Sequence, residues 1–235
     1  MSTSRARSWW AMAGAGAAVI ALVSIPVLAE KGDGASGVKL KVDEAGRRVD
    51  VTVDGKPFTS YIWPTTLKKP VLYPIRTAEG TVVTRGFPLE PRPGERVDHP
   101  HHVGLWLNHG DVSGFDFWNN SEAIPAKDAP KYGAIVQRSI KRATSGADKG
   151  ELEVTMDWVT PAGKRLLSED TTFVFRGGPG TRSIDRLTTL TAQDQRVVFN
   201  DSKEGTKSWN EELDFLSKTH PDNTFLVKVA YWLSR

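Results

Sequence analysis

The sequence contains no cysteine, and this absence excludes several kinds of chemistry. Without thiols the folded chain has no disulfides, no thiolate metal ligands and no cysteine nucleophile. A lipoprotein signal is excluded as well, because its lipid is attached to a cysteine. The chain must therefore be stabilised by an apolar core, for which 235 residues are sufficient in a single domain.

An excess of charge of one sign is also missing. The chain has 31 Lys and Arg residues against 28 Asp and Glu residues. Two of the basic residues, Arg5 and Arg7, lie in an N-terminal segment without acids, so that 29 remain when this segment is removed. A nearly neutral domain offers no electrostatic basis for binding nucleic acid, and we expect no nucleic-acid partner.

Long apolar runs are absent except at the N-terminus. The run over residues 9–28 follows the two arginines, and the small-residue pattern that ends at Ala29 is typical of a signal peptidase site. We predict a signal peptide over residues 1–29, a polar linker over residues 30–37, and a periplasmic or extracellular mature protein. The alternative is an uncleaved anchor, because the run is long enough to span a bilayer. That segment would be the only contact with a membrane.

Helical periodicity is scarce before residue 207, whereas alternation of apolar and polar residues is common. The first two alternating segments cover residues 38–42 and 49–53, and Asp54-Gly55 is a hairpin signal. Turns rich in Gly, Pro and Ser, about 8–12 residues apart, separate the later segments, as in sandwiches and barrels. These later segments are residues 81–90, 132–144, 150–178 and 181–201. We predict an all-β domain, an antiparallel β-sandwich over residues 38–206.

The last part of the chain, residues 207–235, differs in character. Trp209, Leu213 and Leu216 lie at helical spacing, with acids early and a lysine late in the segment. Residues 222–235 fit either a second helix or a strand. We expect a short, atypical helical tail that reflects a truncated chain, a frameshift or a genuine extension.

Histidine is rare, but its distribution is uneven. Four of the five histidines lie within eleven positions: His99, His101, His102 and His109. Pro100 favours an extended His99, which would place His99 and His101 on one side and His102 on the other. Residues 103–107 resemble a buried strand, and glycines at positions 104, 110 and 114 allow close backbone approach or sharp turns.

These histidines permit more than one kind of chemistry. His99, His101, His109 and Asp111 are candidate ligands of a divalent metal. Alternatively, His101, His102 and His109 exchange protons with a sugar near neutral pH, oriented by carboxylates such as that of Asp111. The rings of Trp106 and Trp118 would then provide flat surfaces for a sugar. The alternative without a chemical function is a loop whose polar side chains only accept hydrogen bonds from backbone amides.

Two blocks resemble a known family. "YPIRT" with "GTVVTRGFPLEPRPGERVDHPHHVGLWLNHGDVSGFDFW", and "FNDSKEGT" further on, are similar to the exported bacterial family called PmoA, or methane oxygenase PmoA. The resemblance covers about residues 38–206, and it implies a fold like the galactose-mutarotase supersandwich. In such enzymes a histidine protonates the sugar ring oxygen and a glutamate removes the anomeric proton. The resemblance thus implies Glu204 as the catalytic carboxylate, with Lys203 beside it.

The same resemblance suggests how a substrate would be held. Arg76 and Arg85 lie in matched blocks, and arginine binds carboxylates in a bidentate manner. With His99, the two tryptophans and Lys203, they are candidate substrate-binding residues. We therefore expect a carbohydrate-active protein that uses histidine and carboxylate acid–base chemistry, with a carbohydrate or other small molecule as partner and no required cofactor. The alternatives are a metal-dependent oxygenase or hydrolase and a non-catalytic carbohydrate-binding module.

Overall fold

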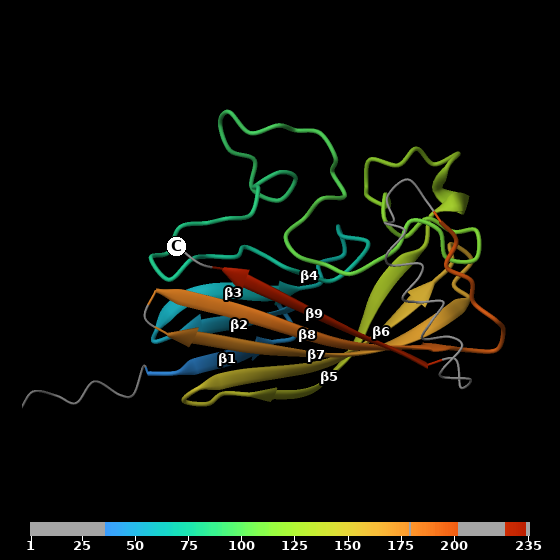
Figure 1. The fold of residues 1–235 in the computed structure, drawn as a ribbon. Helices are drawn as coiled ribbons and strands as arrows, with labels where there is room; N and C mark the ends of the chain where they lie inside the picture. The colour runs from blue at the N-terminus through green and yellow to red at the C-terminus, as the bar shows by residue number, and fades with distance from the viewer. Residues whose placement is uncertain (1–35, 179, 202–223, 234–235) are drawn as a thin grey trace, which may run out of the picture. The chain divides into compact units, whose positions relative to one another are not determined.

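The computed structural model describes residues 36–178 and 180–201, together with the backbone of residues 224–233 (Figure 1). The predicted signal peptide, most of the predicted linker and the helix expected after residue 206 lie outside the described residues. Lys203 and Glu204 lie outside them as well. Within the described part, no helix is both long and apolar enough to cross a membrane.

The smaller of two sheets is an antiparallel meander with the strand order β1-β2-β3-β4. Its strands are β1 (Val38–Asp43), β2 (Arg48–Val53), β3 (Lys56–Ile62) and β4 (Val71–Leu72). Asp54 and Gly55 join β2 to β3 with φ angles of 52° and 73°, as a two-residue hairpin turn requires. The predicted meander and its hairpin are confirmed.

The larger sheet is also antiparallel and has the order β5-β6-β7-β8-β9. Its strands are β5 (Ala134–Thr144), β6 (Lys149–Val159), β7 (Arg165–Gly178), β8 (Thr181–Ala192) and β9 (Thr224–Leu233). The expectation of a helical tail is therefore wrong for residues 224–233, where the alternative of a strand is correct. This segment is rich in β-branched and aromatic residues, which favour strands.

The two sheets face one another across one apolar core, which confirms the predicted β-sandwich (Figure 1). Phe58 of β3 meets Phe175 of β7 edge to face, with ring centroids 6.3 Å apart. Gly150 of β6 allows β1 to approach, because an added Cβ would lie 2.4 Å from the side chain of Leu40. These close contacts make the sandwich a rigid support for the loops at its edge.

A long connection, residues 73–133, leaves β4 and returns to β5, and it carries little regular structure (Figure 1, green). Its one named element is a short 3-10 helix, η1 (Ala129–Lys131). Isolated bridges tie the connection to itself and to the smaller sheet: Leu72 pairs with Leu105, and Asp116 pairs with Tyr132. The histidine-rich segment is thus held against β4.

Two strands expected in this connection are not formed. Residues 81–90 contribute only the isolated bridge of Val82 with Arg76 and form no ladder strand. Residues 103–107 form only the bridge at Leu105, because Gly104 has a φ of 61° and interrupts the extended chain.

Candidate functional site

A cavity of about 580 Å³ opens where the connection passes the end of β4. This volume falls within the range of about 300–1,000 Å³ that is usual for small-molecule sites. The residues around it come from the β3–β4 loop, from β4 and from three parts of the connection. They are Thr66, Leu67, Lys68, Lys69, Val71, Phe87, Pro88, Leu89, Pro100, His101, Val103, Asn120, Ser121, Glu122 and Ala123.

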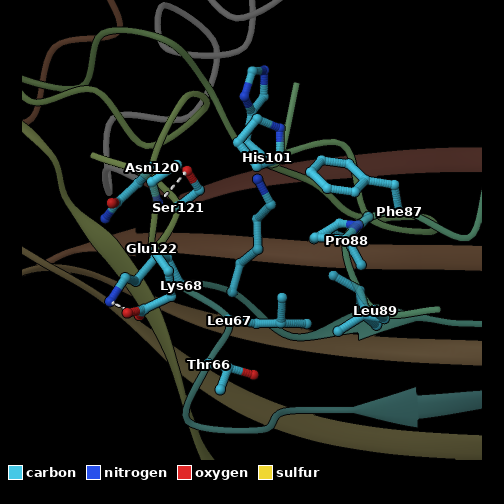
Figure 2. Close-up of a pocket in the computed structure, with 15 residues that line it drawn as sticks. Thr66, Leu67, Lys68, Phe87, Pro88, Leu89, His101, Asn120, Ser121 and Glu122 are labelled. Carbon is cyan, nitrogen blue, oxygen red and sulfur yellow. Dashed lines mark hydrogen bonds and ion pairs between the residues drawn. The ribbon is translucent and has the colours of Figure 1, made fainter. Parts of the chain in front are cut away.

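The cavity has two walls of different character. Figure 2 shows the apolar side chains of residues 87–89 on one side and the polar side chains of residues 120–122 on the other. His101 lies at one end, in the space between the two walls in this view. Such a combination suits a ligand that has one apolar face and several hydroxyl or carbonyl groups on the other.

Lys69 is a buried amine in the wall of this cavity. Its exposed fraction is 5 %, its Nζ donates to the carbonyl oxygen of Trp118 at 3.2 Å, and the same nitrogen lies 4.7 Å from the ring centroid of Trp106. Among the described residues, no ion pair includes Lys69. Burial lowers the pKa of Lys69 from 10.5 to about 7, and the negative charge of Asp116 opposes this decrease only in part.

The predicted histidines and tryptophans do come together. His101 is 9 % exposed, and its ring centroid lies 4.3 Å from that of His102. His99 stacks on His102 at 4.9 Å, and Trp106 and Trp118 lie 5.7 and 6.2 Å from His102. His99, His101 and His102 thus lie together beside Trp106 and Trp118, but of these five residues only His101 lines the cavity.

The backbone at His99 differs from the expectation. His99 has a φ of 50°, in the left-handed region, and its carbonyl accepts a hydrogen bond from the amide of His102 at 2.9 Å. Because this turn folds the segment back, the rings of His99 and His102 stack on the same side instead of pointing to opposite sides. The imidazole of His99 is 55 % exposed and lies 3.2 Å from the carboxylate of Asp98.

The two arginines of the resembling blocks bind backbone carbonyls. Arg85 donates to the carbonyl oxygens of Arg96 and Asp98 at 2.6 and 2.7 Å, immediately before the histidine turn, which comprises residues 99–102. Arg76 donates to the carbonyl of Gly80 at 3.4 Å. In this structure, then, Arg85 fixes the shape of the histidine turn, and neither arginine lines the cavity described above.

Gly104 sets the distance between the histidine segment and β4. A Cβ at this position would lie 2.3 Å from the carbonyl oxygen of Leu72, and the φ of 61° is itself unfavourable for other residues. Gly114 has a φ of 88° but open space around it. The roles expected from the sequence are confirmed at both glycines, close approach at the first and a sharp turn at the second.

Asp116 orders the chain on the polar side of the cavity. Its Oδ1 accepts hydrogen bonds from the amides of Trp118 and Asn119 at 2.8 and 2.9 Å, and its Oδ2 accepts one from Nδ2 of Asn119 at 2.8 Å. These bonds fix the carbonyl of Trp118, which is the acceptor for Lys69. Asp116 therefore affects the amine of Lys69 in two ways. It positions the carbonyl that accepts a hydrogen bond from this amine, and its negative charge favours the charged form of the amine.

His109 and Asp111 contact a different part of the chain. Nε2 of His109 lies 2.7 Å from the carbonyl oxygen of Asn200, and its ring packs edge to face on Phe199. Asp111 accepts hydrogen bonds from the amide of Gly114 at 2.8 Å and from Nδ2 of Asn200 at 3.1 Å. Both side chains contact Asn200, and they join the connection to the segment that follows β8.

The metal site proposed from the sequence is not assembled. Over residues 36–178 and 180–201, no group of three or more His, Asp and Glu side chains is arranged to hold a metal ion. The four candidates divide between two places, because His99 and His101 belong to the histidine turn while His109 and Asp111 bind Asn200.

Several cavity residues were not identified from the sequence. Nothing in the sequence indicates that Lys69 is buried, because a lysine beside a second lysine is usually solvated. Glu122 lies in a polar stretch and forms an ion pair with Lys68, and Asn120 donates to the carbonyl of Gly133 at 2.7 Å. The alternation of apolar and polar residues could not identify Asn120 and Glu122, because the 120–122 segment belongs to neither a strand nor a helix.

The comparison with known families gives one match. No curated protein and no solved structure matches the chain. Residues 48–215 match the model of a family described as a family of unknown function, DUF6807. The match begins at the first residue of β2 and contains the whole histidine-rich connection, the cavity and the strands β5–β8. Since it covers more than half of the sequence, the chain belongs to the DUF6807 family.

Proposed function

We propose that this chain is an exported protein, of the kind called PmoA, that binds a sugar in the cavity beside β4 and uses His101 for proton transfer on that sugar. The observation that carries the proposal is the position of His101, a largely buried imidazole in the wall of a cavity of ligand size. Imidazole exchanges protons near neutral pH, as reactions at a sugar hydroxyl or ring oxygen require.

A carboxylate is available in the same cavity. Glu122 lies on the polar wall, and its side chain is 60 % exposed although it pairs with Lys68. An exposed ion pair of this kind contributes little energy, so a sugar hydroxyl can compete for the carboxylate. Glu122 thus supplies the carboxylate of the proposed histidine–carboxylate chemistry within the described residues.

The two tryptophans offer no open stacking surface to a ligand in the cavity. In a binding module the tryptophan faces would be open to the sugar, whereas Trp106 is occupied here by His102 and by the amine of Lys69. Trp106 and Trp118 also pack on one another, with centroids 5.9 Å apart. Both rings pack against His102 of the histidine turn, and neither lines the cavity.

The test is a search for turnover followed by a substitution. The purified protein without residues 1–29 is incubated with reducing sugars, oligosaccharides and uronic acids, and anomeric exchange and new products are followed by proton NMR. For any active sugar, His101→Gln is expected to lower kcat/KM by about a hundredfold or more. Unfolding in urea shows whether the variant remains folded.

The matched control is His99→Asn. It removes a neighbouring imidazole that does not line the cavity, and asparagine tolerates the left-handed φ at this position. This variant should retain most of the activity. Equal losses in the two variants, or full activity of His101→Gln, would reject the assignment of His101. Binding of a sugar without any product would instead identify a carbohydrate-binding module.

A further inference from the structure

Lys69 differs from an ordinary surface lysine in where its amine lies. The side chain is 5 % exposed, it lines the cavity, and none of the described carboxylates forms an ion pair with it. A lysine in such a place is costly while it is charged, and it loses its proton more readily than a solvated lysine. The neutral amine that results is a nucleophile on a residue that lines a space of ligand size.

We propose that Lys69 forms a covalent imine with the aldehyde carbon of a small hydroxyaldehyde or open-chain sugar bound in this cavity. The inference takes its substrate class from the proposed carbohydrate function. It goes beyond that function, because it assigns a covalent step to a residue that proton transfer by His101 does not require.

The step balances without an additional reagent. The lone pair of Nζ attacks the carbonyl carbon, a C–N bond forms, and the carbonyl oxygen becomes a hydroxyl after proton transfer from nitrogen. Protonated His101, in the wall of the same cavity, donates its proton to this hydroxyl; the nitrogen lone pair then forms the C=N bond as the C–O bond breaks and water is released. The product is a protonated imine, and hydrolysis reverses the sequence.

Binding of an anion is the competing use for a buried amine, and the surroundings disfavour it. An anion would meet the carboxylate of Glu122, which pairs with Lys68, the second cation in the cavity wall. The wall of residues 87–89 is apolar, and the nearby carboxylate of Asp116 repels an anion while it attracts the charged amine. A neutral carbonyl compound encounters none of these penalties.

The experiment traps the imine in the whole mature protein. The protein is incubated at pH 7.5 with glycolaldehyde or glyceraldehyde and sodium cyanoborohydride, which reduces an imine to a stable secondary amine. Tandem mass spectrometry then locates the adduct, since fragments that end between residues 68 and 69 distinguish the adjacent lysines. We expect Lys69 to be modified first, at a rate about tenfold or more above that of Lys68.

Lys68 is the matched control, because it lines the same cavity but is paired with a carboxylate. The fast phase of labelling should disappear in Lys69→Arg and persist in Lys68→Arg. Modification of Lys69 at the average rate of all lysines in the unaltered protein would overturn the inference, whether or not the variants fold. An adduct without sugar turnover would contradict only the proposed function, and turnover without an adduct would contradict only the imine.

Discussion

The amine of Lys69 donates to the carbonyl oxygen of Trp118 at 3.2 Å, across the junction between the β3–β4 loop and the histidine-rich connection. The two residues are far apart in the sequence, and their contact joins a residue of the cavity wall, Lys69, to the histidine-rich connection. Because the acceptor is a neutral carbonyl, the bond compensates only part of the free energy that is lost when a charged amine leaves water. The pKa of Lys69 is lowered to about 7 as a consequence.

Replacement of this lysine should stabilise the protein in a manner that depends on pH. Below about pH 7 the amine is charged in both the folded and the unfolded state, so burial of the charge destabilises the folded state in full. Between about pH 7 and 10.5 only the unfolded state binds the proton, so this destabilisation fades as the pH rises. We expect Lys69→Met to be more stable than the parent by about 3 kcal/mol at pH 6, and the difference to approach zero near pH 10. Urea unfolding of both proteins across this range measures it, and a difference that is constant with pH would contradict the assignment.

Asp116→Asn should lower the pKa of Lys69 further. The carboxylate of Asp116 favours the charged amine, and asparagine removes the charge but keeps an oxygen that accepts from the amides of Trp118 and Asn119. The midpoint of the pH dependence of acetylation at Lys69 should therefore shift to lower pH. Asp111→Asn is the control, because Asp111 instead binds Gly114 and Asn200 and should leave this midpoint unchanged. A shift of equal size in both variants would mean that Asp116 has no specific effect.

Gly104→Ala should be far more damaging than Gly114→Ala. Both glycines have positive φ angles, so both substitutions introduce backbone strain of about 1 kcal/mol. Only at Gly104 does the new Cβ also collide with a backbone oxygen, that of Leu72 at 2.3 Å. We expect a loss of about 3 kcal/mol or more at position 104 and about 1 kcal/mol at position 114, measured by urea unfolding. Equal losses would show that the histidine segment is not held closely against β4.

The alternation of residues was enough to predict the sandwich, because each strand buries one face. Val49, Val51 and Val53 are all buried, and the turn at Asp54-Gly55 lies where the sequence placed it. The connection could not be predicted in the same way. Its shape depends on single contacts, such as that of Arg85 with the carbonyl of Asp98, and no periodicity reports these.

The site was predicted only in part, for a related reason. The density of histidine in one segment was sufficient to single out the segment in which His101 lines the cavity, but not to predict the stacking of His99 on His102. Lys68 and Lys69, by contrast, are the same residue type in adjacent positions, yet one pairs with Glu122 and the other is buried over Trp106. Contacts that are distant in sequence decide between these outcomes, so a single sequence contains no local signal for the buried amine.

The larger sheet contains a buried charge pair whose removal should destabilise the fold. Glu169 of β7 has no exposed surface and pairs with the guanidinium of Arg186 on β8. The same carboxylate accepts hydrogen bonds from Nε1 of Trp158 at 2.7 Å and from the hydroxyl of Thr171 at 2.6 Å. Burial of Tyr61, and secondly the negative charge of Glu169, raise the pKa of Tyr61 well above 10, so that this phenol stays neutral in the core.

Glu169→Gln should therefore lower the free energy of unfolding by about 3–5 kcal/mol, because it leaves the guanidinium of Arg186 buried without an opposite charge. The control is the next residue, Asp170, whose carboxylate points to the opposite face and pairs with Lys141 at 2.5 Å while both side chains are about half exposed. Asp170→Asn should reduce stability by less than about 1 kcal/mol. The double variant Glu169→Leu with Arg186→Met should recover much of the loss, because it removes both buried charges together. If Glu169→Gln unfolds at the same urea concentration as Asp170→Asn, the buried ion pair of Glu169 and Arg186 stabilises the fold no more than an exposed one.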